Sequence, residues 1–152
     1  PMIMPQLYYR ENPFDSASAW NFSRNVPDIV VINLLQNDCA LFKEPDHPEF
    51  RKRFGSNTPS EAFIENAYRD FVTTIRKKYP AAHIICALGS MDAVKPGSPW
   101  PGYISKAVAS IGDPKIYTHF FRFINTPDHP TEKEHEEMAA SLIAFMDQHI
   151  QW

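Results

Sequence analysis

Cysteine and glycine are scarce in this chain, which has two cysteines and five glycines among its 152 residues. Two cysteines cannot build a disulfide framework. We therefore expect Cys39 and Cys86 to be buried free thiols, although a single disulfide between them stays open. No glycine-rich turn follows any apolar run, so a flavodoxin-like domain that binds a phosphate or nucleotide is the weakest interpretation.

Strong charge and long apolar runs are lacking as well. The formal net charge is −3, so electrostatics give no reason to expect nucleic acid or an anionic membrane as a partner. No apolar run approaches the roughly 20 residues that a membrane span needs. Residues that can form a hydrophobic core are abundant, because 43% of the residues are hydrophobic and 13% are aromatic. This composition is typical of a domain that builds its own core.

Apolar periodicity predicts alternating strands and helices. Three β-branched or continuously apolar runs predict buried parallel strands at residues 28–34, 83–90 and 115–121. Three helices are predicted. The first begins at a capping box at 58–61, with Thr58 as its cap, and ends at Tyr79; the second covers 104–111. The third begins at a capping box at 131–134 and ends at Ile150. Residues 39–57 and 95–103 are predicted to be loops. The order predicts an α/β fold, a three-layer α/β/α flavodoxin-like parallel sheet.

One predicted strand ends on three polar residues. In "PDIVVINLLQNDC", which runs from Pro27 to Cys39, the apolar run gives way to Gln36, Asn37 and Asp38. Active sites of open α/β sheets lie at the carboxyl ends of the strands. A neutral amide there can donate to a developing oxyanion, and His129, after the third strand, can act as a general base. The pair suits acyl transfer and lacks a nucleophile.

These stretches resemble the SGNH hydrolases, the GDSL-type esterases. "PDIVVINLLQND" is similar to their G-x-N-D block, and "PDHPTEKEH" is similar to the block in which His-Pro opens the last helix. The wider order, with "MPQLYYR", "WNF", "IRKKYP" and "SPWPGY", is closest to the family 2 carbohydrate esterases. The resemblance covers essentially the whole chain.

The resemblance implies roles for particular residues. Asn37 would donate to the oxyanion, and His129 would act as general base and acid, with no cofactor. Asp38 would hold the local turn. Asp128 would lie near the site, but a side chain adjacent to His129 points away from its imidazole.

Two weaker candidates for substrate contact are Gln36 and Trp100. The Trp100 ring could stack on a sugar or plug the core.

The chain departs from the family pattern in three places. Leu35 replaces the glycine before x-N-D. Thr126 and Pro127 stand where many members have an aspartate. The G-D-S block with the nucleophilic serine, and the block with an oxyanion glycine, are absent; in the family they precede the "MPQLYYR"-like stretch.

We therefore expect residues 1–152 to be the C-terminal portion of a single SGNH domain. Residues 1–26 would be an irregular lead-in, and the sheet would be incomplete at its N-terminal edge. The N-terminal part of the domain, cleaved or missing, or a second copy in a homodimer would then be a partner. The family implies a secreted or periplasmic location, which the sequence leaves open.

The expected function is deacetylation of a carbohydrate ester by serine and histidine. The alternative is a non-catalytic, truncated or degenerate domain that binds a carbohydrate or a partner through the surviving rim. Ser90, at the end of the second strand, could replace the serine, but no elbow motif surrounds it. A metal site is not expected, because the spacing of the histidines matches no tight ligand pattern. His47, in a second "DHP" at 46–48, is a minor site candidate.

Overall fold

In the part of the chain that the structure describes, three parallel strands form one sheet. The computed structural model describes residues 3–125 and 129–151. The strands are β1 (Ile29–Asn33), β2 (His83–Leu88) and β3 (Ile116–Phe120), in the order β1-β2-β3. In the register, Val31 lies beside Ile85, and Ile85 lies beside Tyr117. The α/β fold and all three predicted strands are confirmed.

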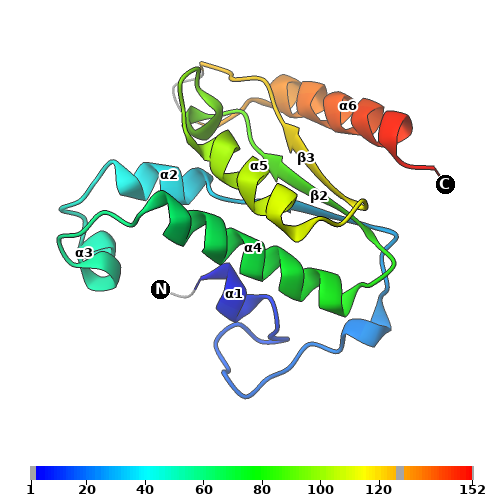
Figure 1. Cartoon of the computed structure of the whole chain (residues 1–152), viewed down its shortest axis with the longest axis horizontal. Helices are drawn as coiled ribbons and strands as arrows, with labels where there is room; N and C mark the ends of the chain where they lie inside the picture. The colour runs from blue at the N-terminus through cyan, green and yellow to red at the C-terminus, as the bar shows by residue number, and fades with distance from the viewer. Residues whose placement is uncertain (1–2, 126–128, 152) are drawn as a thin grey trace.

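Helices cover the two faces of the sheet unequally (Figure 1). The helices α4 (Glu61–Lys78) and α5 (Trp100–Ile111) lie on one face, and α6 (Glu132–His149) lies on the other. The hydrophobic core lies between the sheet and the α4–α5 layer. There the β2 side chains Ile84, Cys86 and Leu88, all 0% exposed, pack in one cluster with residues of α4 and α5. Both cysteines are buried free thiols.

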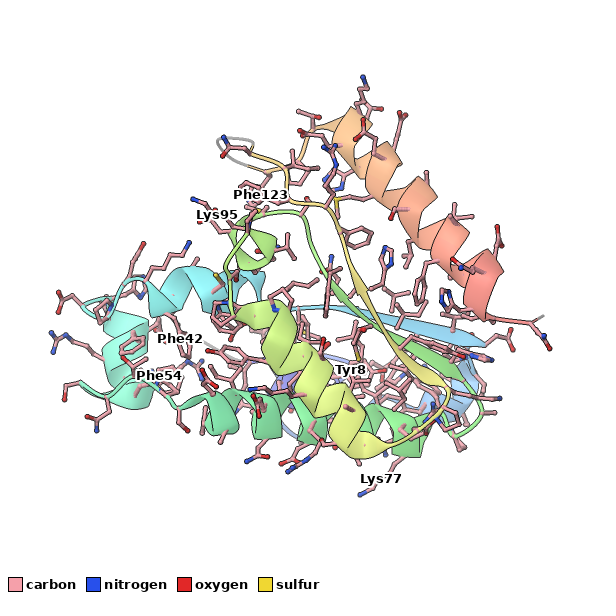
Figure 2. The ribbon with its side chains drawn as sticks, turned by 45° about the horizontal axis from the view of Figure 1, so that its top comes forward. Tyr8, Phe42, Phe54, Lys77, Lys95 and Phe123 are labelled. Carbon is pink, nitrogen blue, oxygen red and sulfur yellow. The ribbon has the colours of Figure 1, made fainter. Side chains whose placement is uncertain are left out.

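Short helices lie on the loops between these elements, and two predicted loops were wrong in part. The short elements are α1 (Met4–Leu7), η1 (Phe22–Arg24), α2 (Gln36–Phe42), α3 (Pro48–Phe54) and η2 (Asp92–Val94). We expected residues 39–57 to be a loop, yet α3 begins there because Pro48 occupies its first turn, where the missing N–H costs nothing. The rings of Phe42 in α2 and Phe54 in α3 then pack together, with their centroids 5.6 Å apart (Figure 2). Likewise α5 begins at Trp100, inside the predicted 95–103 loop.

The start of α4 was also misplaced. Ser60, and not Thr58, is its N-cap, because the Ser60 hydroxyl accepts a hydrogen bond from the Phe63 N–H at 3.2 Å. The capping box that opens α6 is confirmed, with Thr131 as its cap and Glu134 as the returning carboxylate.

The N-terminal segment, residues 3–26, packs against α4. The Tyr8 ring packs edge-on against the Phe71 ring, with the ring centroids 5.7 Å apart. The centroids of the Phe22 and Tyr79 rings lie 5.8 Å apart. Figure 2 places Tyr8 beneath the helical layer. The segment therefore covers a helix, and among the described strands β1 pairs with β2 alone.

One half of the sheet face under α6 is open. The Phe145 ring of α6 packs on His119 and Tyr117 of β3 at 4.9 and 6.1 Å. Val31, which shares this face on β1, remains 43% exposed, and Ile143 of α6 is 54% exposed. We call the β1 side chains Val31 and Asn33 the open half-face. An unpaired strand edge beside exposed apolar side chains favours association with another chain.

None of the helices in the described ranges has the length and apolar character of a membrane-spanning segment.

We predict that the purified chain forms dimers or larger species, because the β1 edge and the open half-face gain by being covered. Val31→Lys should shift it toward a monomer of 17.5 kDa, since a lysine there would have to be desolvated on association. Light scattering with size-exclusion chromatography measures this. Ala109→Lys, on the exposed side of α5, is the matched control and should leave the oligomeric state unchanged. A monodisperse wild-type monomer with a cooperative melt would contradict the prediction.

Candidate functional site

The carboxyl ends of the three strands meet along one edge of the sheet, which we call the rim. β1 leads through Leu34 and Leu35 into α2, β2 leads into η2, and β3 leads into residues 121–125. The segment after β3 stays attached to the end of β2. The Phe121 N–H donates to the Leu88 carbonyl at 3.0 Å, and the Ile124 N–H donates to the Ser90 carbonyl at 2.8 Å. The rim is therefore a continuous surface made from segments distant in sequence.

The turn from β1 into α2 is strained at Leu35. Its backbone has φ 79° and ψ 0°, in the left-handed region, and it is the only described non-glycine residue with a positive φ. The left-handed conformation costs an L-residue with a β-carbon about 1–2 kcal/mol. Leu35 is the position at which the resembling family has glycine, so the leucine adopts a conformation that favours glycine. The packing of its side chain against the core offsets part of the strain.

Asn37 and Asp38 lie exposed in the first turn of α2. The Asn37 amide is therefore accessible just after the carboxyl end of β1, and its role as an oxyanion donor stays a prediction. Although Asp38 as a whole is exposed, the chain packed around its carboxyl group partly desolvates that group and raises its pKa. Its own backbone N–H and the charge of Arg53 act in the opposite direction. Whether Asp38 holds the turn stays a prediction.

The Gln36 side chain makes a structural contact, and its role in substrate binding stays a prediction. Its side-chain oxygen accepts a hydrogen bond from the Ala93 N–H at 3.2 Å, which ties α2 to η2. Lys43, at the other end of α2, forms an ion pair with Asp92 of η2. The two ties hold α2 and η2 together as one support of the rim.

His129 lies exposed between β3 and α6, two residues before the N-cap Thr131. The capping box fixes the chain just after it, since the Thr131 hydroxyl lies 2.8 Å from Glu134 Oε2. Asn37 thus follows β1 and His129 precedes α6, both exposed, and their joint role at the rim stays a prediction. Asp128, with the rest of 126–128, lies outside the described residues.

Three of the alternative site residues are occupied by structural contacts. Ser90 is 1% exposed, and its hydroxyl meets the Met138 sulfur at 3.2 Å, so a substrate carbonyl cannot reach it. Trp100 is 6% exposed, and its ring centroid lies 5.3 Å from that of Phe42, which favours the core-plug interpretation over stacking on a sugar. His47 is the N-cap of α3, accepting from the Glu49 N–H.

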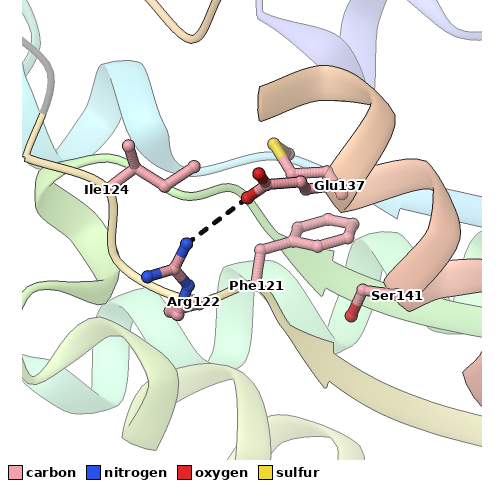
Figure 3. A pocket seen from close by; sticks show the side chains of 6 residues that line it. Phe121, Arg122, Ile124, Glu137 and Ser141 are labelled. Atoms are coloured by element: carbon pink, nitrogen blue, oxygen red, sulfur yellow. Dashed lines mark hydrogen bonds and ion pairs between the residues drawn. The ribbon is translucent and has the colours of Figure 1, made fainter. Parts of the chain in front are cut away.

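A hollow of about 270 Å³ lies between the end of β3 and α6. Its lining is Phe121, Arg122, Ile124, Glu137, Met138 and Ser141 (Figure 3). An ion pair from Arg122 to Glu137, 3.4 Å long, crosses it. No sequence pattern predicts this hollow, because it depends on where α6 docks.

Beside this hollow, the Ser141 hydroxyl lies 3.2 Å from His119 Nε2. Burial and the nearby His149 lower the pKa of His119. We assign the contact to the packing of α6, because it satisfies a ring nitrogen that α6 partly covers. Within the described ranges, no three histidine, cysteine or acidic side chains gather as a metal-binding group.

We predict that Leu35→Gly is more stable to unfolding than Leu35→Ala, by about 1 kcal/mol. Both variants lose the side chain, but only glycine also loses the left-handed strain. Urea denaturation in the Val31→Lys background measures the difference without association. At Leu34, which has no positive φ, alanine should be the more stable of the same two variants. Equal or reversed stabilities at position 35 would show that the turn is not strained.

Comparison with known proteins relates this architecture to carbohydrate esterases. No protein-family profile matches the sequence. The chain is 28% identical, over 166 residues, to the cellulase/esterase CelE of Acetivibrio thermocellus, covering 100% of this chain and 18% of CelE. It is 26% identical to a family two carbohydrate esterase from Clostridium thermocellum in complex with cellohexaose, with a TM-score of 0.75. That match covers 96% of this chain and 43% of the esterase.

A further solved structure shares the fold. It is a carbohydrate esterase family 2 enzyme with a carbohydrate-binding domain from Corynascus thermopiles, with a TM-score of 0.77 and 24% identity, covering 100% of this chain and 46% of that one. The chain thus spans less than half of the solved structures and about a fifth of CelE. It is an α/β chain that resembles the SGNH-type family 2 carbohydrate esterases over part of their length.

Proposed function

We propose that this chain is the C-terminal portion of an SGNH-type esterase domain that removes acetyl groups from a carbohydrate. The observation that carries the proposal is the turn at Leu35. A leucine adopts the left-handed conformation there, and the next turn leaves Asn37 exposed after β1, at the edge of the sheet where His129 would join it. The likeness to family 2 carbohydrate esterases along the whole chain supports the same chemistry.

The nucleophile would be a serine from outside these 152 residues. The match to less than half of each solved esterase leaves room for such a segment. The unpaired edge of β1 is the place where a further parallel strand could bring it to the rim, next to the strand that leads to Asn37. This arrangement of the domain is part of the proposal.

The chemistry would proceed through an acyl-enzyme. His129 would take the proton of the serine hydroxyl as its oxygen attacks the acetyl carbonyl, and Asn37 would donate to the developing oxyanion. His129 would then protonate the departing sugar oxygen. A water activated by the same ring would release acetate and regenerate the serine. The cellohexaose bound to a similar esterase suggests a β-linked glucan or a related polysaccharide as the carrier of the acetyl group.

We expect that the 152-residue chain alone does not hydrolyse 4-nitrophenyl acetate beyond the background of a His129→Ala variant. It has a base and an oxyanion donor at its rim but no activated serine there. Fusing it to a segment that bears a G-D-S block, taken from one of the similar esterases, should produce turnover. Ser90→Ala is the control and should not change that turnover. Robust hydrolysis by the unfused chain that Ser90→Ala abolishes would refute the assignment.

In the fused enzyme, Asn37→Ala should lower kcat by about 10²–10³-fold, the usual effect of removing one oxyanion donor. KM should change little, because the donor acts mainly in the transition state. Steady-state kinetics on an acetylated sugar separates the two constants. Asn57→Ala, at an exposed loop position, is the matched control. A raised KM with unchanged kcat would make Asn37 a ground-state contact instead.

The alternative is a non-catalytic domain that binds a carbohydrate or a partner through the rim. The observation that favours it is that no serine in a G-D-S block occurs in these 152 residues. Calorimetric titration of the chain with cellohexaose tests it. Binding that Asn37→Ala weakens, together with an inactive fusion, would support this function over the esterase.

A further inference from the structure

The Gln36 side chain has only one possible orientation at the rim. Its amide meets the Ala93 N–H, 57 residues away in the chain, at 3.2 Å. A backbone N–H can only donate, so the oxygen of Gln36 must face η2 and the nitrogen must face the other way. Ala93 is itself held, because it is 0% exposed and its carbonyl accepts from the Ser98 hydroxyl at 2.7 Å. The amide is therefore tied to a fixed point.

Gly89 provides the space in which this amide lies. A β-carbon on Gly89 would stand 3.2 Å from Gln36 Nε2 and 3.5 Å from the side-chain oxygen of Asn33. The 3.2 Å contact is tighter than ordinary van der Waals packing, so a larger residue would push the amide away. Gly89 has no positive φ, so here the need is for room and not for an unusual backbone.

The nitrogen of the same amide is buried and has no hydrogen-bond acceptor among the described residues. An unsatisfied buried donor costs about 1–3 kcal/mol. A methionine would fill a similar volume without this cost. What the glutamine contributes in this structure is thus the single bond from its oxygen to the Ala93 N–H.

That bond holds a turn that would otherwise relax. Leu35, directly before Gln36, is strained, and strained backbone persists only where its surroundings over-determine it. The helix α2 has seven residues, too few to be stable by itself. Its position depends on its packing in the core, through Cys39 and Phe42, and on its ties to η2, of which Gln36 makes the one at its N-terminal end.

We propose that Gln36 is a positioning residue, seated on Gly89, which fixes the first turn of α2 and thereby the direction of the neighbouring Asn37 amide. The proposal rests on the proposed role of Asn37 in stabilising the oxyanion. An oxyanion donor acts through pre-organisation, and a displacement of about 1 Å can cost 10²-fold in rate. The tie at Gln36 is the contact nearest to Asn37 that could supply this rigidity.

The tie is tested first in the 152-residue chain, without any activity. Gln36→Met removes the acceptor, so hydrogen exchange of the Ala93 N–H should accelerate at least about tenfold, and the Asn37 side-chain NH₂ should become more mobile by NMR relaxation. Gln36→Glu keeps an acceptor at the same place and should restore both. Gln148→Met, at an exposed position of α6, is the matched control. Unchanged exchange and unchanged Asn37 mobility in Gln36→Met, with the fold intact by circular dichroism, would overturn the proposal.

The consequence for catalysis is tested in the fused esterase. Gln36→Met should lower kcat about tenfold with KM unchanged, and Gln36→Glu should recover most of the loss. A loosened Asn37 with full kcat would overturn the positioning role. If the fused wild-type enzyme is inactive, the proposed function fails, and the mobility of Asn37 in the chain alone decides whether Gln36 positions it.

Discussion

The rim depends on one constraint, the left-handed backbone at Leu35. β1 is apolar except for its last residue, Asn33, and the chain must then turn so that the polar residues of α2 reach the edge of the sheet. That change of direction places the first turn of α2, with Asn37 exposed, at the rim. A leucine opposes this conformation, so the surrounding contacts must hold it. The core packing of Leu35 and the Gln36–Ala93 hydrogen bond are those contacts.

The unequal covering of the sheet bears on function as well as on stability. The central strand β2 is buried on both faces, and it anchors the segments that follow β1 and β3. β1 is different, because it leads to Asn37 and also presents an unpaired edge and an exposed Val31. Under the proposed function these features belong together, since a serine supplied from outside the chain would have to arrive beside this strand.

The errors of sequence reasoning share a physical cause. Residues 39–57 and 95–103 were predicted to be loops, but Pro48 and Pro101 lie in the first turns of α3 and α5, where a proline fits. Thr58 was predicted to be the N-cap of α4, but Ser60, two residues later, takes that position. The hydrogen bond from the Phe63 N–H to the Ser60 hydroxyl identifies Ser60 as the cap. Trp100 was a possible sugar contact until the docking of α5 placed its ring on Phe42. In each case a local pattern had two solutions and packing selected one.

Local sequence patterns were enough to predict the order of strands and helices and the parallel sheet, and they predict Asn37 and His129 at the same edge. These follow from short-range periodicity, from capping patterns such as Thr131 with Glu134, and from the rule that parallel strands end together. Only the tertiary structure decided the backbone of Leu35, the tie from Gln36 to Ala93 and the burial of Ser90 under Met138. Two of those features join residues that are far apart in the chain. The third holds Leu35 in a backbone conformation that leucine disfavours. Their energies come from contacts that no local pattern contains.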